Sequence, residues 1–312
     1  MDSYVAMGCR PTWTCAPYQL DGRPGLGEHV AWAESNAIVF ANSVLGARTD
    51  RYGDFIDICA AIAGRVPESG LHTDRGRKAT LLVRLEGLPD ELLHADALYP
   101  VLGLCLGRLA GREVAAVDGL PTDTSEDRLK ALGAAAASSG SVALFHAIGV
   151  TPEAPNREAV EADDALDAVI TLADLRAARD GVSAVPDGAE IGAVSVGTPH
   201  ASVAQLRRLA GLVGDQPLRV PFYVNTGRAQ LEGVGSLADS LAEAGITVVT
   251  DTCTYVTPII RGVAGPVMTD SGKWAWYAPS NLGVDVALGS LEDCVRSAAT
   301  GRVTRERSLW GD

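Results

Sequence analysis

Three of the six cysteines stand among polar turn residues, and these three are the first candidates for chemistry. Cys15 lies in RPTWTCAPY, Cys253 in VVTDTCTYVTP and Cys294 in SLEDCVRSA. Cys59 and Cys105 lie in apolar helical patterns instead and are expected to be buried small hydrophobic residues. No two cysteines have CxxC spacing, which excludes a zinc ribbon or a thioredoxin-type motif. A disulfide framework is not expected in a reducing compartment.

A second candidate region is the stretch ESNAIVFANSVLGARTDRYGDFID, residues 34–57. It places Asn36, Asn42 and Arg48 among residues with the apolar character of a core segment. Two interpretations stay open from this pattern. The stretch is either a helix that runs out into a solvated loop or a rigid element that presents polar groups to a ligand.

The second half of the chain shows the elements that would position such groups. Runs rich in β-branched residues alternate with helical patterns, which indicates a mostly parallel sheet covered on both faces. The expected strands are residues 167–172, 191–196, 218–225, 246–250 and 284–288. Ligands of such sheets bind outside the carboxyl ends of the strands. The residues expected at these ends are Thr198, His200, Thr226, Arg228, Asp251, Cys253, Gly289 and Ser290.

The first half of the chain is less regular. Residues 31–45 and 98–109 have helical spacing of their apolar positions. The acidic, proline-bearing stretch 151–167 is expected to be a surface connection or linker. We therefore place a soft boundary there and expect two parts of an α/β protein, residues 1–150 and 151–312.

Composition excludes several classes of protein. The 312 residues carry a formal net charge of −13, which argues against generic nucleic-acid binding. No apolar run approaches the roughly 18–20 residues that span a bilayer, so no membrane partner is expected. The N-terminal sequence MDSYVAMGCRPTWTC lacks the features of a signal peptide. We expect a cytoplasmic protein.

Several ordered motifs together resemble a known family. They are the 34–57 stretch, GRVPESGLH, VGTPHAS, TDTCTYVTP, VMTDSGKWAWYAP and GSLEDCVRSAATG. From about Cys9 to the C-terminus, the chain resembles the large, catalytic part of aconitase X. The resemblance implies an aconitase-like α/β fold of mostly parallel sheets flanked by helices, with the active site at strand carboxyl ends between subdomains. It also implies an iron–sulfur cluster and hydro-lyase chemistry.

The family resemblance implies two alternative substrates. RYGDFIDICAAIAGRVP resembles the branch that dehydrates cis-3-hydroxy-L-proline to pyrroline-2-carboxylate. The branch that dehydrates mevalonate 5-phosphate is expected to have a Gly-Gly-Pro-Ser-type sequence after the arginine. A third alternative is an inactive, truncated remnant that still binds a cluster.

The cluster ligands implied by the resemblance are Cys15, Cys253 and Cys294. Cysteine thiolates suit iron–sulfur centres, and three ligands would leave one iron position open to act as a Lewis acid. Trp13 stands where the family often has a further cysteine. The number of ligands does not fix the cluster type.

The remaining site residues are assigned on the same resemblance and on side-chain chemistry. Arg48 is expected to bind the substrate carboxylate, because a guanidinium recognises it through two hydrogen bonds. Each assignment has a structural alternative. Arg48 would be a surface arginine at a helix end, Ser35 a helix cap, and Lys273 and His200 structural residues. The catalytic candidates are Ser35, Arg48 and Lys273, and the substrate-binding candidates are Asn36, Asn42, Tyr52, His200 and Thr226.

The family pattern also includes parts that are not visible in this sequence. The resemblance implies an N-terminal segment and a small swivelling domain, fused or on a separate chain. That domain would supply part of the active site, including a serine as the general base. We therefore expect a swivelling-domain subunit as a partner, besides a small hydroxy amino acid as the substrate.

Overall fold

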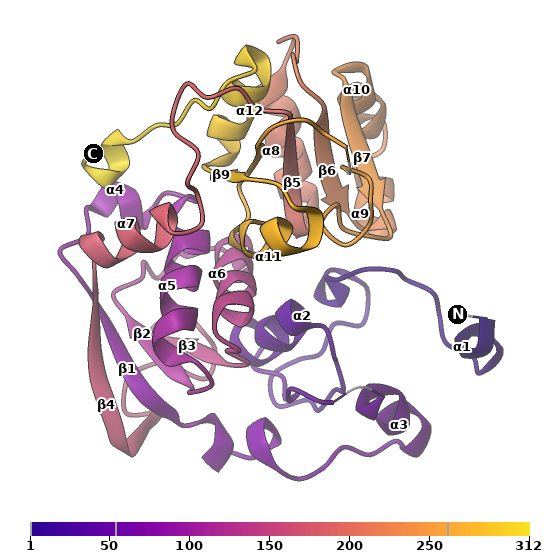
Figure 1. Ribbon diagram of the computed structural model, residues 1–312. Coiled ribbons are helices and arrows are strands. Elements are labelled where there is room, and N and C mark those ends of the chain that lie inside the picture. Colours follow the sequence, from indigo (N-terminus) through magenta and orange to yellow (C-terminus); the bar gives the residue numbers. More distant parts are fainter. Residues whose placement is uncertain (1, 54, 261) are drawn as a thin grey trace.

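The computed structural model describes residues 2–53, 55–260 and 262–312, which form two parallel sheets flanked by helices (Figure 1). The first sheet has the order β3-β2-β1-β4, and the second has the order β7-β6-β5-β8-β9. Every strand pair within them is parallel. The strands are β1 (Ala79–Glu86), β2 (Ala115–Asp118), β3 (Phe145–Ala147), β4 (Glu161–Thr171), β5 (Ala193–Ala201), β6 (Phe222–Thr226), β7 (Ile246–Thr250), β8 (Val267–Thr269) and β9 (Val286–Leu288). The α/β prediction is confirmed.

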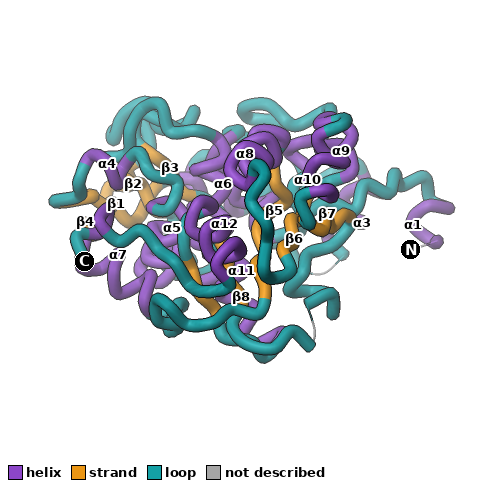
Figure 2. The backbone as a smooth tube through the Cα atoms, turned by 90° about the horizontal axis from the view of Figure 1, so that it is seen from above, coloured by secondary structure: helices purple, strands orange, loops and turns teal. Residues whose placement is uncertain are grey.

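Helices cover both sheets, and α11 lies between the two sheets near one end of α6 (Figure 1). In Figures 1 and 2, which differ by a rotation of 90°, α1 lies apart from the rest of the fold. The α-helices are α1 (Asp2–Ala6), α2 (Ser35–Val39), α3 (Ile56–Ala63), α4 (Asp90–Leu93), α5 (Leu98–Ala110), α6 (Glu126–Ser139), α7 (Leu172–Asp180), α8 (Val203–Val213), α9 (Arg228–Val234), α10 (Leu237–Glu243), α11 (Gly272–Leu282) and α12 (Leu291–Thr300). The short helices are η1 (Pro17–Gln19), η2 (Phe40–Val44), η3 (Gly70–His72), η4 (Arg75–Arg77) and η5 (Ser308–Trp310).

Each of the five strands expected in the second half overlaps an observed strand. β7 has the expected bounds, whereas β6 is shorter than expected and β5 extends further, to Ala201. The short strand β8 was not anticipated, because its three residues stand alone without a longer β-branched run.

The first sheet continues beyond the expected boundary at residue 150. Its edge strand β4 begins at Glu161 and pairs with β1. The acidic stretch 151–167 is therefore a loop followed by half of a strand, and the linker prediction is wrong for that half. The acidic residues fit this position because much of β4 is exposed at the sheet edge. The division of the chain at residue 150 remains a prediction.

Helices α5 and α6 pack so closely that only glycine fits at their contact. A Cβ atom added to Gly103 would lie 2.2 Å from the carbonyl oxygen of Leu132, and one added to Gly140 would lie 1.8 Å from that of Gly107. These two helices cover the first sheet and build a large core cluster with Leu98, Leu102 and Leu132. The close packing fixes the position of α6, whose first turn borders the second sheet (Figure 1).

The segment predicted as one helix over 31–45 is divided into α2 and a π-helical turn, η2. Asn42 lies in η2 and is fully buried. Its side-chain amide donates to the carbonyl oxygens of Thr49 and Ala143, and its oxygen accepts from the Thr49 amide and the Arg77 guanidinium. This polar side chain ties the end of the helix to the following loop, because every one of its hydrogen-bonding groups has a protein partner.

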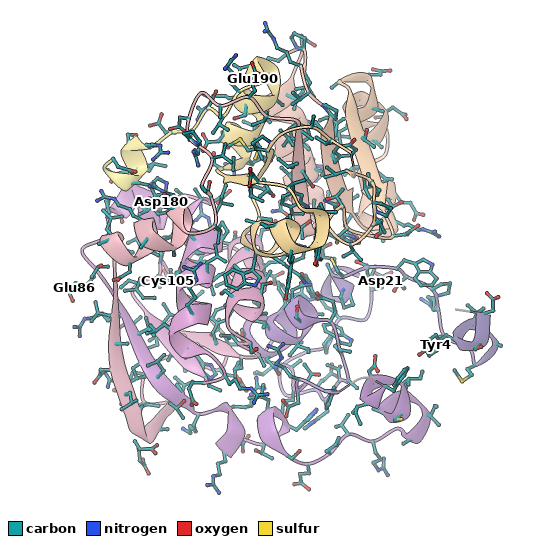
Figure 3. The ribbon with its side chains drawn as sticks, in the orientation of Figure 1. Tyr4, Asp21, Glu86, Cys105, Asp180 and Glu190 are labelled. Carbon is teal, nitrogen blue, oxygen red and sulfur yellow. The ribbon has the colours of Figure 1, made fainter. Side chains whose placement is uncertain are left out.

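The two cysteines expected to be buried differ from each other. Cys105 in α5, labelled in Figure 3, lies partly buried against the core, and burial raises the pKa of its thiol to about 11. Cys59 is exposed, so its prediction was wrong. It belongs to α3, which has no buried residue despite its apolar sequence. Within the described residues, no helix has the length and apolar character needed to cross a membrane.

Candidate metal and substrate site

The fold brings Cys15, His200 and Cys253 together at the carboxyl edge of the second sheet. One ligand atom from each residue lies within 4.8 Å of the other two. His200 is near the end of β5, Cys253 follows β7, and Cys15 comes from the N-terminal loop. His200 and Cys253 are buried and Cys15 is partly buried. Residues separated by more than 180 positions therefore form one compact group of two thiols and an imidazole.

The environment of this group favours a thiolate at Cys15. A hydrogen bond from Cys253 lowers the pKa of the Cys15 thiol, burial opposes that effect, and His200 and Lys273 lower it further. The backbone amide of His200 also donates to the Cys15 Sγ at 3.4 Å. Hydrogen bonding to Cys15, together with burial, raises the pKa of Cys253 instead. Within the pair, a negative charge is therefore favoured on Cys15 over Cys253.

The imidazole of His200 is held on both sides. Its Nδ1 lies 3.0 Å from the Thr14 hydroxyl, and its Nε2 lies 3.2 Å from the carbonyl oxygen of Thr252. Because a carbonyl oxygen only accepts, Nε2 carries a proton in this arrangement. Ligation of a metal by the ring would require His200 to give up one of these two partners.

A buried ion pair lies beside the thiols. Lys273 in α11 donates to the carboxylate of Glu34 and, at 3.3 Å, to the hydroxyl of Ser35. Its side chain is only 4% exposed. Burial lowers the pKa of Lys273, but the neighbouring Glu34 carboxylate and Tyr255 raise it above its ordinary value. Lys273 is therefore a permanent positive charge next to Cys15 and Cys253.

The carboxylate of Glu34 also begins α2, because it accepts from the amide of Ala37 at 2.9 Å. Asn36, two residues later, contacts the loop that contains Cys15. The Asn36 side chain donates to the carbonyl oxygen of Cys15 at 2.8 Å and accepts from the Tyr18 hydroxyl at 2.6 Å. The structure thus places Ser35, Asn36, His200 and Lys273 around one site.

Other predicted site residues have partners elsewhere. Arg48 donates to the carbonyl oxygen of His72 at 3.0 Å and pairs with Asp74. The Tyr52 hydroxyl contacts the His72 imidazole. Thr226 is buried and donates to the carbonyl oxygen of Ala201 at 2.8 Å. Together with Asn42, these residues are engaged in contacts that hold loops and strand ends.

Cys294 is not part of the group of three ligand residues. It lies fully buried in α12 and packs in the core cluster beneath the second sheet with residues such as Leu206 and Val295. Burial and the carboxylates of Asp270 and Asp293 raise the pKa of its thiol. Burial in this helix favours the neutral thiol of Cys294. Its assignment as a cluster ligand stays a prediction.

Three residues of the site were not predicted from the sequence, namely Glu34, Thr14 and Tyr18. Glu34 gave only a weak signal, because acidic residues are enriched near helix starts but the preferred N-cap residues are Ser, Thr, Asp and Asn. Thr14 and Tyr18 gave none, since their contacts join segments that are distant in the sequence.

The fold and the site define an α/β protein with a thiol-rich site at the carboxyl ends of its strands. Comparison with known families is more specific. Residues 1–75, 79–180 and 191–300 match the first, second and third domains of aconitase X, respectively. The chain belongs to the aconitase X family.

Individual relatives support this assignment. The chain is 40% identical to the cis-3-hydroxy-L-proline dehydratases of Hypocrea jecorina and Pseudomonas aeruginosa, and these alignments cover 96% and 99% of it. It is 37% identical to the phosphomevalonate dehydratase large subunit of Thermococcus kodakarensis, over 96% of this chain and 75% of that protein. A crystal structure of Thermococcus kodakaraensis aconitase X in its holo-form has a TM-score of 0.86 and 34% identity, covering 95% of this chain and 75% of the other. The chain spans about half the length of the two hydroxyproline dehydratases, 52% and 54%.

Proposed function

We propose that this chain is the large part of an iron–sulfur-dependent dehydratase, a hydro-lyase that acts on a small 3-hydroxy acid. The group of Cys15, Cys253 and His200 carries the proposal. The preferred reaction is dehydration of cis-3-hydroxy-L-proline to pyrroline-2-carboxylate. In that reaction a base removes the α-proton, the hydroxyl leaves as water after protonation, and the resulting enamine tautomerises.

The residues of the site fit a soft-metal centre. Two sulfur atoms and one imidazole lie close together in a mostly buried group, and the Cys15 sulfur is favoured as a thiolate. An iron centre bound here would supply a Lewis acid that polarises the substrate's hydroxyl and carboxylate. Cys15 and Cys253 are the proposed sulfur ligands. The third ligand is His200 in the observed arrangement or Cys294 by family resemblance.

The chain's own residues support the chemistry around that centre. Lys273 presents a buried positive charge that would stabilise the substrate carboxylate or the thiolate ligands. Ser35 accepts a hydrogen bond from Lys273 and is fixed at the start of α2. Asn36 holds the Cys15 loop in position through its carbonyl oxygen. We assign no general base in this chain, and a partner with a swivelling domain remains the proposed source of that group.

A second candidate function is that of a phosphomevalonate dehydratase large subunit. The observation that favours it is sequence similarity, since the chain is 37% identical to the Thermococcus kodakarensis large subunit over 96% of this chain. The slightly higher identity, 40% against 37%, favours hydroxyproline.

The test compares both substrates directly. The chain is purified without oxygen, reconstituted with iron and sulfide, and assayed with cis-3-hydroxy-L-proline and with mevalonate 5-phosphate. Each assay is run with and without the product of the neighbouring open reading frame. Formation of pyrroline-2-carboxylate supports the preferred function, whereas turnover of mevalonate 5-phosphate alone supports the second. Reconstituted protein that contains no iron would contradict both.

A further inference from the structure

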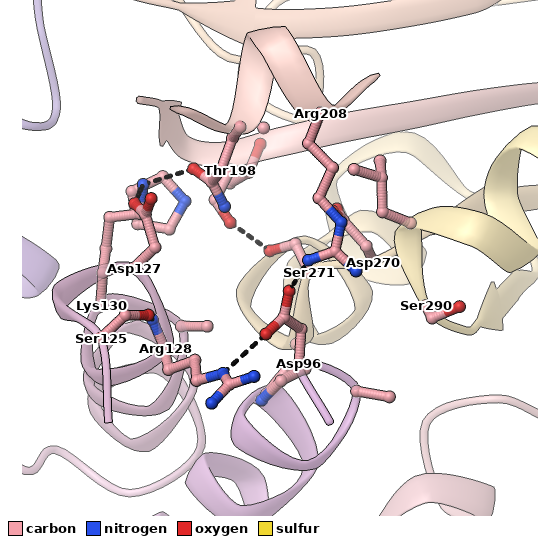
Figure 4. A pocket seen from close by; sticks show the side chains of 18 of the residues that line it. Asp96, Ser125, Asp127, Arg128, Lys130, Thr198, Arg208, Asp270, Ser271 and Ser290 are labelled. Carbon is pink, nitrogen blue, oxygen red and sulfur yellow. Dashed lines mark hydrogen bonds and ion pairs between the residues drawn. The ribbon is translucent and has the colours of Figure 1, made fainter. Parts of the chain in front are cut away.

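A cavity of about 460 Å³ lies on the other side of the β5 end from the cysteine group. It is enclosed by α5 and α6 on one side and by the ends of β5, β8 and β9 on the other (Figure 4). Its walls combine apolar side chains, such as Pro100, Ala131 and Leu291, with charged and polar side chains, which make up more than half of the lining residues. A cavity of this size is typical of a small-molecule site.

This cavity is separate from the proposed metal site. None of Cys15, His200, Cys253, Glu34 and Lys273 lines it. The segments Gly197–Pro199 and Asp270–Gly272 line the cavity, and His200 and Lys273 follow them directly on the other side. The two sites therefore share a backbone wall, and the Lys130 side chain, which lines the cavity, donates to the carbonyl oxygen of His200 at 3.3 Å.

The charged groups of the cavity are unequally paired. Arg128 donates to Asp96 at 2.7 Å, and Arg208 pairs with Asp96 and with Glu292. Lys130 lies 2.7 Å from Asp127 and donates to Gln205 at 2.6 Å. The three cations that line the cavity are thus already neutralised by protein carboxylates.

Asp270 differs from these groups. Within the described residues, its carboxylate has neither a salt bridge nor a hydrogen bond to another side chain, although it lines the cavity. Burial raises its pKa to about 6, while backbone amides of Asp270 and Gly197 and the charge of Lys130 oppose the rise. Its carboxylate therefore lines the cavity with backbone amides, but no side chain, as hydrogen-bond partners. The hydroxyls of Thr198 and Ser290 line the same cavity and can accept further hydrogen bonds.

We propose that this cavity binds a small organic ammonium ion, with the Asp270 carboxylate as its counter-charge. An ammonium group would supply the charged partner that the protein itself does not provide, and the apolar walls would cover the carbon part of the ligand. The ligand class is a primary or secondary amine of the size of a five-membered ring or somewhat larger. The proposal does not depend on the dehydratase function or on a bound cluster.

The experiment measures binding of pyrrolidine, which is a cation at neutral pH, to the full chain by ligand-observed NMR titration. Tetrahydrofuran serves as the uncharged ligand of the same shape. The variants are Asp270→Asn, Asp215→Asn as an exposed control with the same change in net charge, and Cys253→Ser for the other site. Ala131→Leu reduces the volume of the cavity by enlarging an uncharged side chain of its wall. It provides a second test if Asp270→Asn does not fold.

The expected result is that pyrrolidine binds at least tenfold more tightly than tetrahydrofuran. Asp270→Asn should weaken binding of pyrrolidine about tenfold or more, and Ala131→Leu should weaken it as well. Asp215→Asn and Cys253→Ser should each leave it within about twofold, since neither residue lines the cavity. Equal binding of the two ligands, no binding up to about 10 mM, no effect of Asp270→Asn, or loss in Cys253→Ser would each overturn the proposal.

Discussion

Replacing Glu34 by Gln tests how the ion pair beside the cysteines is stabilised. The substitution keeps the shape of the side chain and an oxygen that can cap α2, but it removes the negative charge that faces Lys273. The Lys273 side chain is 4% exposed, so its ammonium group would remain buried with only the Ser35 hydroxyl as its described partner.

The magnitude follows from the burial of the two partners. Removing one partner of a buried pair costs about 3–5 kcal/mol of unfolding free energy. Glu34 is 35% exposed, and solvent screening reduces this value, so we expect a loss of about 2 kcal/mol for Glu34→Gln. Lys273→Met should cost less, about 1 kcal/mol, because the remaining carboxylate can still reach water and keeps the Ala37 amide. The double variant should be more stable than Glu34→Gln alone.

The assay is urea unfolding at pH 7.5 in the presence of a chelator. This pH is suitable because the pKa of Lys273 is raised above its ordinary value of 10.5. The stability from such a group is fully present below the unfolded-state pKa and is lost only as the pH rises through the folded-state pKa. The matched control is the exposed pair Arg23–Glu126, with side chains 41% and 57% exposed, where Glu126→Gln should cost no more than about 0.5 kcal/mol. If Glu34→Gln costs no more than this control, the pair behaves as a surface pair and our reasoning is refuted.

Three further predictions concern the ligand set, the helix contact and pH. Cys15→Ser and Cys253→Ser should each lose most bound iron after anaerobic reconstitution. Cys294→Ala should retain it, because Cys294 lies outside the group of three ligand residues. Loss of iron from Cys294→Ala would instead support the ligand set that the family resemblance implies. Gly103→Ala should lower the unfolding free energy by about 1–3 kcal/mol through overpacking. The control Gly211→Ala in α8, with open space around it, should raise the unfolding free energy by about 0.5–1 kcal/mol. Equal urea midpoints of the two variants would contradict the described contact of α5 with α6. Burial lowers the pKa of His146 below its ordinary value of 6.5. The unfolded state therefore binds more protons, and the unfolding free energy should decrease as the pH falls below 6.5. In the same urea assay, His146→Gln should lose less unfolding free energy than the wild type between pH 7.5 and 5.5, and an equal loss would exclude His146 as its source.

The sequence allowed four of the five strands of the second sheet to be predicted, because β5, β6, β7 and β9 lie in runs rich in β-branched residues, whereas the three-residue β8 was missed. It also placed His200 and Cys253 at strand carboxyl ends, where parallel strands bring distant residues together. The position of Cys15 beside the carboxyl edge of the second sheet could not be derived from hydrophobic periodicity, since Cys15 lies in a loop without regular structure. Only the family resemblance connected these residues before the fold was known.

The interpretation of the 34–57 stretch shows the limit of reasoning from residue type. Its polar residues were taken as one functional set, but the structure separates them. Ser35 and Asn36 lie at the start of α2 beside Lys273 and Cys15, whereas Asn42 and Arg48 bond to the loops that follow. A buried polar side chain needs partners whether or not it touches a ligand. The sequence reveals that need but not which partner meets it.

The same need for partners distinguishes the cysteine group from the neighbouring cavity at the edge of the second sheet. At the cysteine group, the thiolate, imidazole and ammonium have protein partners, so that site is organised without a ligand, and metal binding by the His200 ring would require it to exchange a contact. In the neighbouring cavity, the cations are paired, but the Asp270 carboxylate has no partner side chain in the described part of the chain. An unpaired charge in an apolar space costs folding free energy that a ligand of opposite charge can recover. The carboxylate without a side-chain partner is therefore the main argument for the proposed second site at this edge of the sheet.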